Sequence, residues 1–300
     1  MATGPDWPAR RPRYTIVQIS DPHVPADGFL FDRVDACARV QASVEMIAAA
    51  GWSADVLVLS GDLANQGEAE AYLRLRPVIA DALRCLGAKL LVTPGNHDDV
   101  GLLREHLLDR RSDRGPLDEV VRVGDLRLIG LDSSVPGEAH GELDDAQLEA
   151  LAAELVEPAV DGTVLVVHHP PIWSTTPMSE LVALRDPGRL AAVIRGSDVR
   201  LVLSGHTHRV SAGTLAGVPV WVSPSTGSHA DVLARDGIRG HAGGGFTRVD
   251  ILDDGEIVAT FVPLTGRDEI LYEVAVNELE PSPAVSRWDA GALPRSIPVS

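Results

Sequence analysis

Short runs of Val, Leu and Ile alternate with longer, polar-patterned segments along the first two thirds of the sequence. A run with few polar positions is typical of a strand that is buried on both faces of a sheet. Alternation of such runs with helical segments builds βαβ units and layered α/β folds, so we expect a fold of that class. The runs occupy residues 14–19, 56–59, 90–93, 126–131, 164–167 and 201–203.

Four segments between these runs are predicted to be helices. Two of them repeat apolar residues at helical spacing, as an amphipathic helix does: one at positions i, i+4 and i+7 and the other at i, i+4 and i+8. Asp144 followed by Gln147 is the pattern of a capping box, and Asp186-Pro187 is a typical helix start. The four segments are residues 32–50, 68–86, 144–155 and 186–195.

The pattern changes after His208, where three further runs are separated by Gly and Asp. Such spacing is typical of antiparallel strands joined by tight turns. The runs lie at residues 218–222, 246–252 and 257–263 and are predicted to complete a second sheet, whereas the Gly-rich stretch 237–245 is predicted to be a loop. The expected organisation is an N-terminal segment (1–13), one catalytic domain (14–273, with 209–273 completing the second sheet) and a C-terminal tail (274–300).

The charge balance limits the partners that such a domain can have. The chain has 43 acidic and 26 basic residues and a net charge of −17, and phosphate backbones attract basic surfaces, so no nucleic-acid partner is expected. No apolar run reaches the roughly 18 residues that span a bilayer, and the first residues lack the apolar stretch of a signal peptide. Cys37 and Cys85 are predicted to be small buried hydrophobic residues in helices. Together these features predict a soluble cytoplasmic protein.

Polar residues interrupt the apolar pattern directly after five of the predicted strands. The carboxyl ends of strands are the place where open α/β sheets carry their functional sites. Each interruption contains Asp, Asn or His. The five interruptions are Ser20-Asp21-Pro22-His23, Ser60-Gly61-Asp62, Pro94-Gly95-Asn96-His97-Asp98, His168-His169-Pro170 and Ser204-Gly205-His206-Thr207-His208.

These side chains have the chemistry of a catalytic metal centre. Carboxylate and amide oxygens combined with imidazole nitrogens suit iron, manganese and zinc, and the lack of thiolates argues against a structural cysteine–zinc site. The D-x-H spacing puts Asp21 and His23 on the same side of an extended segment, and the pair His206 and His208 repeats that spacing. A carboxylate shared by two ions about 3.5–4 Å apart would clamp an in-line displacement at phosphorus.

Each interruption by itself is also compatible with a structural role. A single His after a strand is more often a hydrogen-bonded structural residue, and D-x-H or G-D pairs are common by chance. Five interruptions in this order, each at a predicted strand end, favour a metal centre over structural coincidence.

The motif series D-x-H, G-D, G-N-H-D, H and G-H-T-H resembles that of the calcineurin-like metallophosphoesterase superfamily. The resemblance extends over residues 14 to 265. Three stretches are further similar to the bacterial class III cyclic nucleotide phosphodiesterases: VVHHPPI at 166–172, ELVALRD at 180–186 and VRLVLSGHTH at 199–208. The resemblance implies a four-layer αββα sandwich, in which helices flank two mixed sheets and a dinuclear metal site lies at the strand ends.

The resemblance also implies a role for each motif residue. Iron and manganese are the expected ions, and zinc and cobalt are the alternatives. His97 matches the superfamily's non-ligand histidine beside the substrate phosphate, where it can protonate the leaving alkoxide. The implied ligands are Asp21, His23 and His208 for one metal, Asn96, His168 and His206 for the other, and Asp62 as the bridge between them.

Some neighbouring residues keep two interpretations open. His169 is predicted to be a structural residue or to support a ligand. Asp98 could orient His97 or act as the N-cap of the segment that follows it. The wall of the substrate site is predicted in residues 173–184 and 223–245, with His140 and His229 near it.

The predicted reaction is the hydrolysis of a phosphodiester by metal-activated water. Two cations lower the pKa of a water shared between them, and the resulting hydroxide attacks phosphorus held on the same ions. The resemblance places 3′,5′-cyclic nucleotides, with cyclic AMP first, ahead of glycerophosphodiesters, other diesters and monoesters. A non-catalytic scaffold is disfavoured because every implied ligand position is present. The similar phosphodiesterases are often dimers, which leaves a homodimer open.

Overall fold

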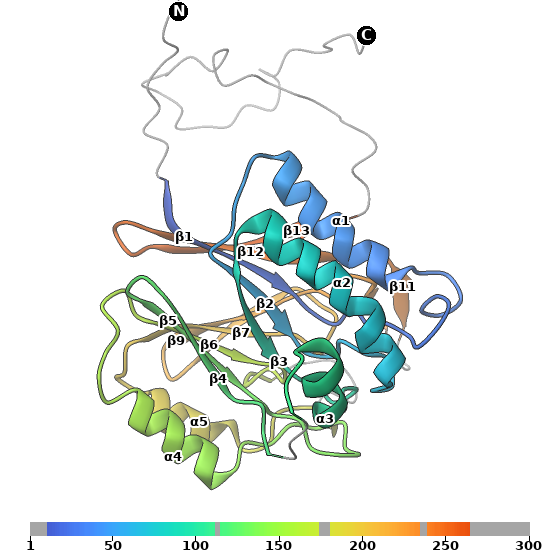
Figure 1. Ribbon diagram of the computed structural model, residues 1–300. Coiled ribbons are helices and arrows are strands. Elements are labelled where there is room, and N and C mark those ends of the chain that lie inside the picture. The colour runs from blue at the N-terminus through green and yellow to red at the C-terminus, as the bar shows by residue number, and fades with distance from the viewer. Residues whose placement is uncertain (1–10, 112–114, 174–180, 235–238, 265–300) are drawn as a thin grey trace, which may run out of the picture.

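Two large sheets pack face to face and carry helices on their outer faces in the computed structural model (Figure 1). The structure describes residues 11–111, 115–173, 181–234 and 239–264. The order of the layers is helix, sheet, sheet, helix, which confirms the predicted four-layer αββα sandwich. The predicted tail 274–300 and the boundary at residue 273 lie outside the described residues.

The first sheet has the strand order β13-β12-β1-β2-β3. Strands β1 (Pro12–Ile19), β2 (Val56–Ser60) and β3 (Lys89–Thr93) run parallel. Helices α1 (Ala36–Ala49) and α2 (Ala69–Leu86) connect them and cover the outer face of this sheet. Strands β12 (Gly245–Leu252) and β13 (Ile257–Pro263) extend the sheet antiparallel beyond β1.

The second sheet has the strand order β4-β5-β6-β7-β9-β8. Its four central strands are parallel: β5 (Leu126–Leu131), β6 (Thr163–Val167), β7 (Val199–Ser204) and β9 (Val218–Val222). The edge strands β4 (Glu119–Val123) and β8 (Ser211–Leu215) are antiparallel to their neighbours. Helices α4 (Asp145–Glu154) and α5 (Pro187–Ile194) cover the outer face.

Side chains alternate along the strands, so each sheet buries both of its faces. In β1, Ile16 packs into the core between the two sheets, together with Val58 of the first sheet and Val166 of the second. The next residue, Val17, packs instead against the helices of the outer layer. This two-sided burial explains the continuous apolar runs from which the strands were predicted.

The prediction that residues after His208 complete the second sheet is only partly correct. Strands β8 and β9 belong to the second sheet, but β12 and β13 belong to the first, where β12 pairs with β1. Apolar patterning predicts that a segment is a strand but does not specify its partner, and here β12 pairs with the edge of β1 that β2 leaves open.

Several local elements differ from the sequence-based expectation. The predicted loop 237–245 contains a short strand, β11 (Gly240–Ala242), which pairs with β10 (Ser228–Ala230). Strands β4 and β8 were not predicted, because edge strands face solvent and need few apolar residues. A short helix, α3 (Val100–Leu102), continues into a π-helical turn, Leu103–Leu107, which was also not predicted.

The sequence signals for helix N-termini were correct for α4 and α5 but not for α1. Asp144 and Gln147 form the predicted capping box of α4, and Pro187 begins α5. Helix α1 instead begins at Ala36, four residues after the predicted start, because Asp35 is its N-cap and accepts a hydrogen bond from the Ala38 amide. Cys85 is exposed, contrary to prediction, because it lies on the solvent face of α2, whereas Cys37 is half-buried.

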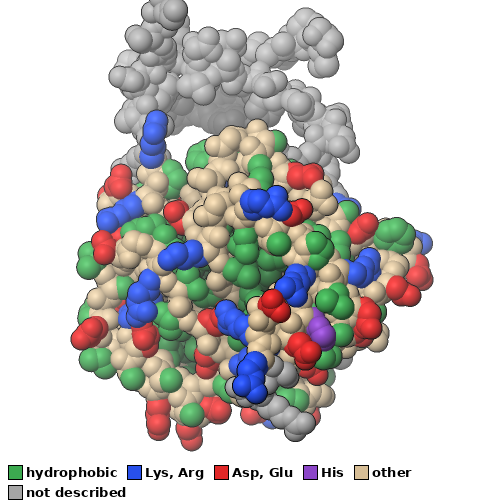
Figure 2. All heavy atoms as spheres, viewed as in Figure 1, with side chains coloured by type: hydrophobic (Ala, Val, Ile, Leu, Met, Phe, Trp, Pro, Cys, Tyr) green, Lys and Arg blue, Asp and Glu red, His purple; other side chains and the backbone are tan. Residues whose placement is uncertain are grey.

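Acidic, basic and apolar side chains are interspersed on the face seen in Figure 2, as is usual for a solvated surface. Within the described ranges, the helices are too short or too polar to cross a lipid bilayer.

Candidate metal centre

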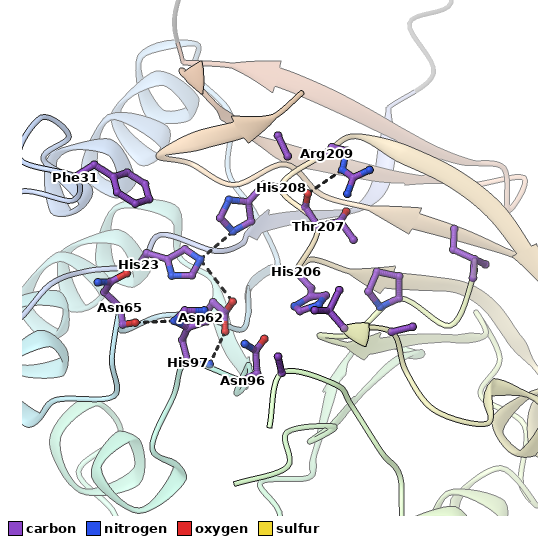
Figure 3. Close-up of a pocket in the computed structure, with 16 residues that line it drawn as sticks. His23, Phe31, Asp62, Asn65, Asn96, His97, His206, Thr207, His208 and Arg209 are labelled. Atoms are coloured by element: carbon purple, nitrogen blue, oxygen red, sulfur yellow. Dashed lines mark hydrogen bonds and ion pairs between the residues drawn. The ribbon is translucent and has the colours of Figure 1, made fainter. Parts of the chain in front are cut away.

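Five strands from both sheets end at one edge of the sandwich, and backbone hydrogen bonds join the loops that follow neighbouring strands. The Asp21 amide donates to the Gly61 carbonyl at 3.0 Å, and the His23 amide donates to the Asp62 carbonyl at 3.0 Å. The Gly205 amide donates to the His168 carbonyl at 3.0 Å, which joins the loops after β6 and β7. The structure thereby brings the five polar interruptions of the sequence to one place (Figure 3).

One group of potential ligands consists of Asp21, His23, Asp62 and His208, whose ligand atoms lie within 4.8 Å of one another. The Nε2 atoms of His23 and His208 are 2.9 Å apart. Asp62 Oδ2 is 3.5 Å from His23 Nε2, and Asp21 Oδ1 is 3.5 Å from His208 Nε2. Two imidazoles and two carboxylates with this spacing can surround one cation.

A second group consists of His168, His169 and His206, also with ligand atoms within 4.8 Å of one another. Asp62 lies between the two groups, because its Oδ2 atom is 3.4 Å from His168 Nε2. Asn96 lines a cavity together with Asp62 and His206. His169, predicted to be structural or to support a ligand, is thus itself a potential ligand. Its Nδ1 atom lies 2.8 Å from the Ser133 hydroxyl oxygen.

Buried polar atoms without partners test whether this group can hold a metal. Among the described residues, these atoms include Asn96 Oδ1, His168 Nε2 and both ring nitrogens of His206. Burial of such atoms is costly unless another group satisfies them. His168 Nδ1 donates to the Ser60 carbonyl at 2.7 Å, so Nε2, the atom that faces Asp62, is the nitrogen that can give up its proton and offer a lone pair to a metal ion. The donor set therefore fits a metal ion.

The backbone is strained at five of these residues. Asp21, His23, Asp62, His206 and His208 have φ angles of 51°, 48°, 51°, 70° and 53°, in the left-handed region that non-glycine residues rarely adopt. Each such residue costs on the order of 1–3 kcal/mol, and such strain persists mainly at functional sites. The strained backbone lowers the stability of the folded state, and it turns these side chains toward a common point.

Burial and mutual charge set the protonation of the group. Burial lowers the pKa values of His23 and His206 to about 4, which keeps both imidazoles neutral and able to act as ligands. Burial alone would raise the pKa of Asp62, but the surrounding histidines, His168 foremost, together outweigh burial and hold that pKa well below its usual range. Burial alone would likewise lower the pKa of His168, but Asp62, together with Asp21 and the Ser60 carbonyl, raises it to about 9. The buried Asp62 carboxylate therefore stays ionised and favours a positive charge beside it, which is either a proton on His168 or a metal ion.

Gly95 allows the closest approach in the site, and replacing it tests that packing. A Cβ atom here would overlap the Asp62 carboxylate and lie 2.7 Å from His168 Nε2. We expect Gly95→Ala to weaken the binding of Mn²⁺, measured by calorimetry, by about 10- to 100-fold. Gly240→Ala is the matched control, because nothing lies within 4 Å of its added Cβ. Equal affinities in the two variants would contradict the prediction.

His97 is exposed beside the two ligand groups and is fixed in its tautomer. Its amide donates to Asp62 Oδ1 at 2.9 Å, and its Nδ1 atom lies 2.7 Å from the Asn65 carbonyl oxygen (Figure 3). A carbonyl only accepts, so Nδ1 carries the hydrogen and Nε2 is the atom that can take up or release a proton. Sequence reasoning did not single out Asn65, whose carbonyl gives no signal in the sequence.

Asp98 has neither of its predicted roles. Its carboxylate accepts hydrogen bonds from the amides of Leu63, Ala64 and Gly95 and from the Tyr72 hydroxyl. The N-cap of the following helix is Asp99, which accepts from the Leu102 amide at 2.9 Å. Asp98 therefore ties the loop after β2 to the loop after β3.

A cavity of about 450 Å³ opens over the candidate ligands. The predicted wall segment 173–184 contributes Val182 and Ala183, while residues 174–180 lie outside the described part of the chain. The predicted segment 223–245 contributes Ala230. Two further lining residues, Phe31 and Arg209, were not predicted.

The two histidines predicted near the wall do not line the cavity, although their chain neighbours Ala139 and Ala230 do. His140 does not line the cavity, and its Nε2 atom is 3.2 Å from Glu142. His229 lines a neighbouring cavity, where it stacks on His241 with ring centroids 5.2 Å apart.

Comparison with known proteins agrees with the geometry. A profile of the calcineurin-like phosphoesterase family matches residues 14–210. A probable cyclic nucleotide phosphodiesterase from Rhodococcus erythropolis is 42% identical over 256 residues, which cover 85% of this chain and 85% of that protein. A cAMP/cGMP dual specificity phosphodiesterase from Mycobacterium tuberculosis is 42% identical over 263 residues, 87% of this chain and 82% of that protein. A dimetal phosphatase from Danio rerio shares the fold, with a TM-score of 0.59 at 15% identity over 83% of this chain and 96% of that chain.

Proposed function

Because the chain belongs to the calcineurin-like phosphoesterase family and is a metal-dependent phosphodiester hydrolase, we propose that its substrates are 3′,5′-cyclic nucleotides, with cyclic AMP first. The observation that carries the hydrolytic part is the convergence of unpartnered, buried nitrogen and oxygen atoms beneath one open cavity. The cyclic nucleotide part is supported by the printed activities of the two bacterial relatives, which match this chain over most of their length.

We assign the candidate ligands to two metal positions. The burial, the neutral imidazoles and the shared Asp62 carboxylate support this arrangement. When bound, the metal ions would supply Lewis-acid charge at phosphorus and make a water molecule more acidic. Iron and manganese are our first choice for the pair, and zinc and cobalt are alternatives for these oxygen and nitrogen donors. The assignment is Asp21, His23 and His208 for one ion, Asn96, His168 and His206 for the other, and Asp62 shared.

The remaining residues of the site would bind the substrate and supply the proton that the leaving oxygen needs. With Nδ1 committed to the Asn65 carbonyl, His97 Nε2 can hold a proton and transfer it to the oxygen that leaves phosphorus. The hydrogen bond that the His97 amide donates to the Asp62 carboxylate holds the His97 backbone next to the loop after β2. The apolar lining, including Pro170 and Ile172, reduces the access of bulk water to the reacting phosphate.

The proposal is tested with purified wild-type protein and three classes of phosphate ester. We expect about two metal ions per chain by mass spectrometry and faster turnover of cyclic AMP than of p-nitrophenyl phosphate. Glycerophosphoethanolamine, a diester without a ring, serves as the matched competitor. Faster turnover of that diester than of cyclic AMP would make the protein a glycerophosphodiesterase. Metal binding without turnover of any ester would point to a scaffold and refute the proposal.

A further inference from the structure

An exposed aromatic ring stands at the mouth of the cavity over the candidate metal centre. Phe31 lines this cavity, yet 72% of its surface is exposed. In Figure 3 its ring lies on the side of His23 and Asn65, at the edge of the hollow in which the ligand side chains converge. Single exposed apolar residues are common, so exposure alone does not suggest a function.

The backbone of Phe31 provides the second observation. Phe31 and Asp32 have φ angles of 53° and 56°, and a left-handed conformation is an outlier for a bulky side chain. Strain of this kind persists only where surrounding contacts enforce it. The fold therefore holds this ring out over the cavity at a cost in stability.

The contacts that enforce the conformation lie on both sides of Phe31. Leu30 and Val34 are buried and form a two-way backbone bridge, with distances of 2.9 and 3.0 Å between amide nitrogen and carbonyl oxygen. The Arg74 guanidinium from α2 donates to the Pro25 carbonyl at 2.6 Å and to the Gly28 carbonyl at 3.1 Å. These hydrogen bonds fix the turn to the body of the protein. The backbone of Phe31 is therefore held in place at the cavity.

The rest of the cavity lining is divided between polar and apolar residues. Its floor is polar and contains Asp62, Asn96 and His97, whereas Pro170, Ile172, Val182 and Ala183 make an apolar wall. The volume of about 450 Å³ lies within the range of small-molecule sites. A substrate with a phosphate at one end and a planar apolar group at the other would match this division.

We propose that Phe31 is a specificity-determining residue on which the nucleobase of the substrate stacks while its phosphate lies over Asp62 and His97. This inference rests on the proposed cyclic nucleotide activity and adds the residue that recognises the base. Stacking on an aromatic side chain tolerates any base, because every base has a π-face. Phe31 accordingly contributes to the choice of nucleotides over other phosphodiesters and does not discriminate adenine from guanine.

Binding of two ligands to the metal-loaded protein tests the inference. Adenosine 5′-phosphate carries both base and phosphate, whereas inorganic phosphate carries only the group that reaches the floor. We expect Phe31→Ala to raise the calorimetric Kd of adenosine 5′-phosphate by about fivefold or more, since aromatic stacking of one base spans roughly 5- to 150-fold in affinity. The Kd of inorganic phosphate should stay within about twofold, because the ring does not reach it.

Three companion variants separate stacking from other effects. Phe31→Tyr should keep the affinity for adenosine 5′-phosphate, and Phe31→Leu, which keeps apolar bulk without a ring, should lose most of it. Phe29→Ala removes an aromatic side chain that is 54% exposed on the same turn but does not line the cavity, and it should leave both Kd values unchanged. In turnover, Phe31→Ala should raise KM for cyclic AMP and leave KM for glycerophosphoethanolamine unchanged.

The outcomes distinguish this inference from the proposed function. An equal loss of affinity for both ligands in Phe31→Ala would mean that Phe31 shapes the metal centre, and no loss for either would mean that the base lies elsewhere. A change from dimer to monomer with unchanged Kd values would make the ring a contact between copies of the chain. Each of these results overturns the inference while cyclic AMP is still hydrolysed by the wild type. Absence of that hydrolysis is instead the failure of the proposed function.

Discussion

Asp62→Ala is expected to lower kcat/KM for cyclic AMP and for bis(p-nitrophenyl) phosphate on the order of 10³-fold or more. The Asp62 carboxylate is buried and lies 3.5 Å from His23 Nε2 and 3.4 Å from His168 Nε2, so it faces both groups of ligands. Its loss affects both metal positions, and a metal ion contributes several kcal/mol to the stability of a phosphoryl transition state. Each 1.36 kcal/mol corresponds to a tenfold change in rate.

Metal content distinguishes this explanation from misfolding. Asp62→Ala should retain less metal than the wild type in mass spectrometry, with little change in far-ultraviolet circular dichroism. Asp231→Ala is the matched control, because Asp231 is a carboxylate at the wall of the neighbouring cavity and is not in either ligand group. A fully active Asp62→Ala variant would show that the two groups work without a shared carboxylate.

His97→Ala is expected to lower kcat for cyclic AMP by about 10²- to 10⁴-fold, the usual contribution of a positioned general acid. The effect on bis(p-nitrophenyl) phosphate should be much smaller, because p-nitrophenolate leaves without needing a proton. The ribose 3′-oxygen of cyclic AMP is a poor leaving group and benefits from protonation. The fixed tautomer of His97, with Nδ1 held by the Asn65 carbonyl, makes Nε2 the proton donor in this explanation.

His229→Ala provides the control for removing an imidazole close to the site. His229 lines the neighbouring cavity and stacks on His241, so its loss should change neither substrate's kcat. Metal content should remain at the wild-type level in His97→Ala. Equal losses on the two substrates would argue that His97 binds the phosphate and does not protonate the leaving group.

The elements that produce a local pattern in the sequence could be predicted from the sequence alone. Two-sided burial produces continuous apolar runs, so the strands that hold Asp21, Asp62 and Asn96 could be recognised from their neighbours. Polar residues directly after those runs had to lie at strand ends. The capping box at Asp144 was equally readable, because both of its hydrogen bonds join residues three positions apart.

Features that depend on partners distant in the sequence were not accessible in this way. Strand β12 pairs with β1 although no local pattern specifies that pairing. Asp98 accepts hydrogen bonds from backbone amides of another loop, and amides are present at every non-proline residue. Phe31 is one apolar residue among many until the fold places it over the cavity.

The pairing of β1 with β12 also has a consequence for how the chain folds during synthesis. Thr15 and Asp250 are hydrogen-bonded neighbours in this pair, although 235 positions separate them. Contacts of such high sequence separation slow folding, and an unpaired strand edge invites association with other chains. During synthesis on the ribosome, this edge of β1 stays unpaired until β12 has emerged, when almost the whole domain has been made. The loop that begins at Asp21 follows β1 directly, so metal uptake is expected to be a late event that accompanies closure of the first sheet.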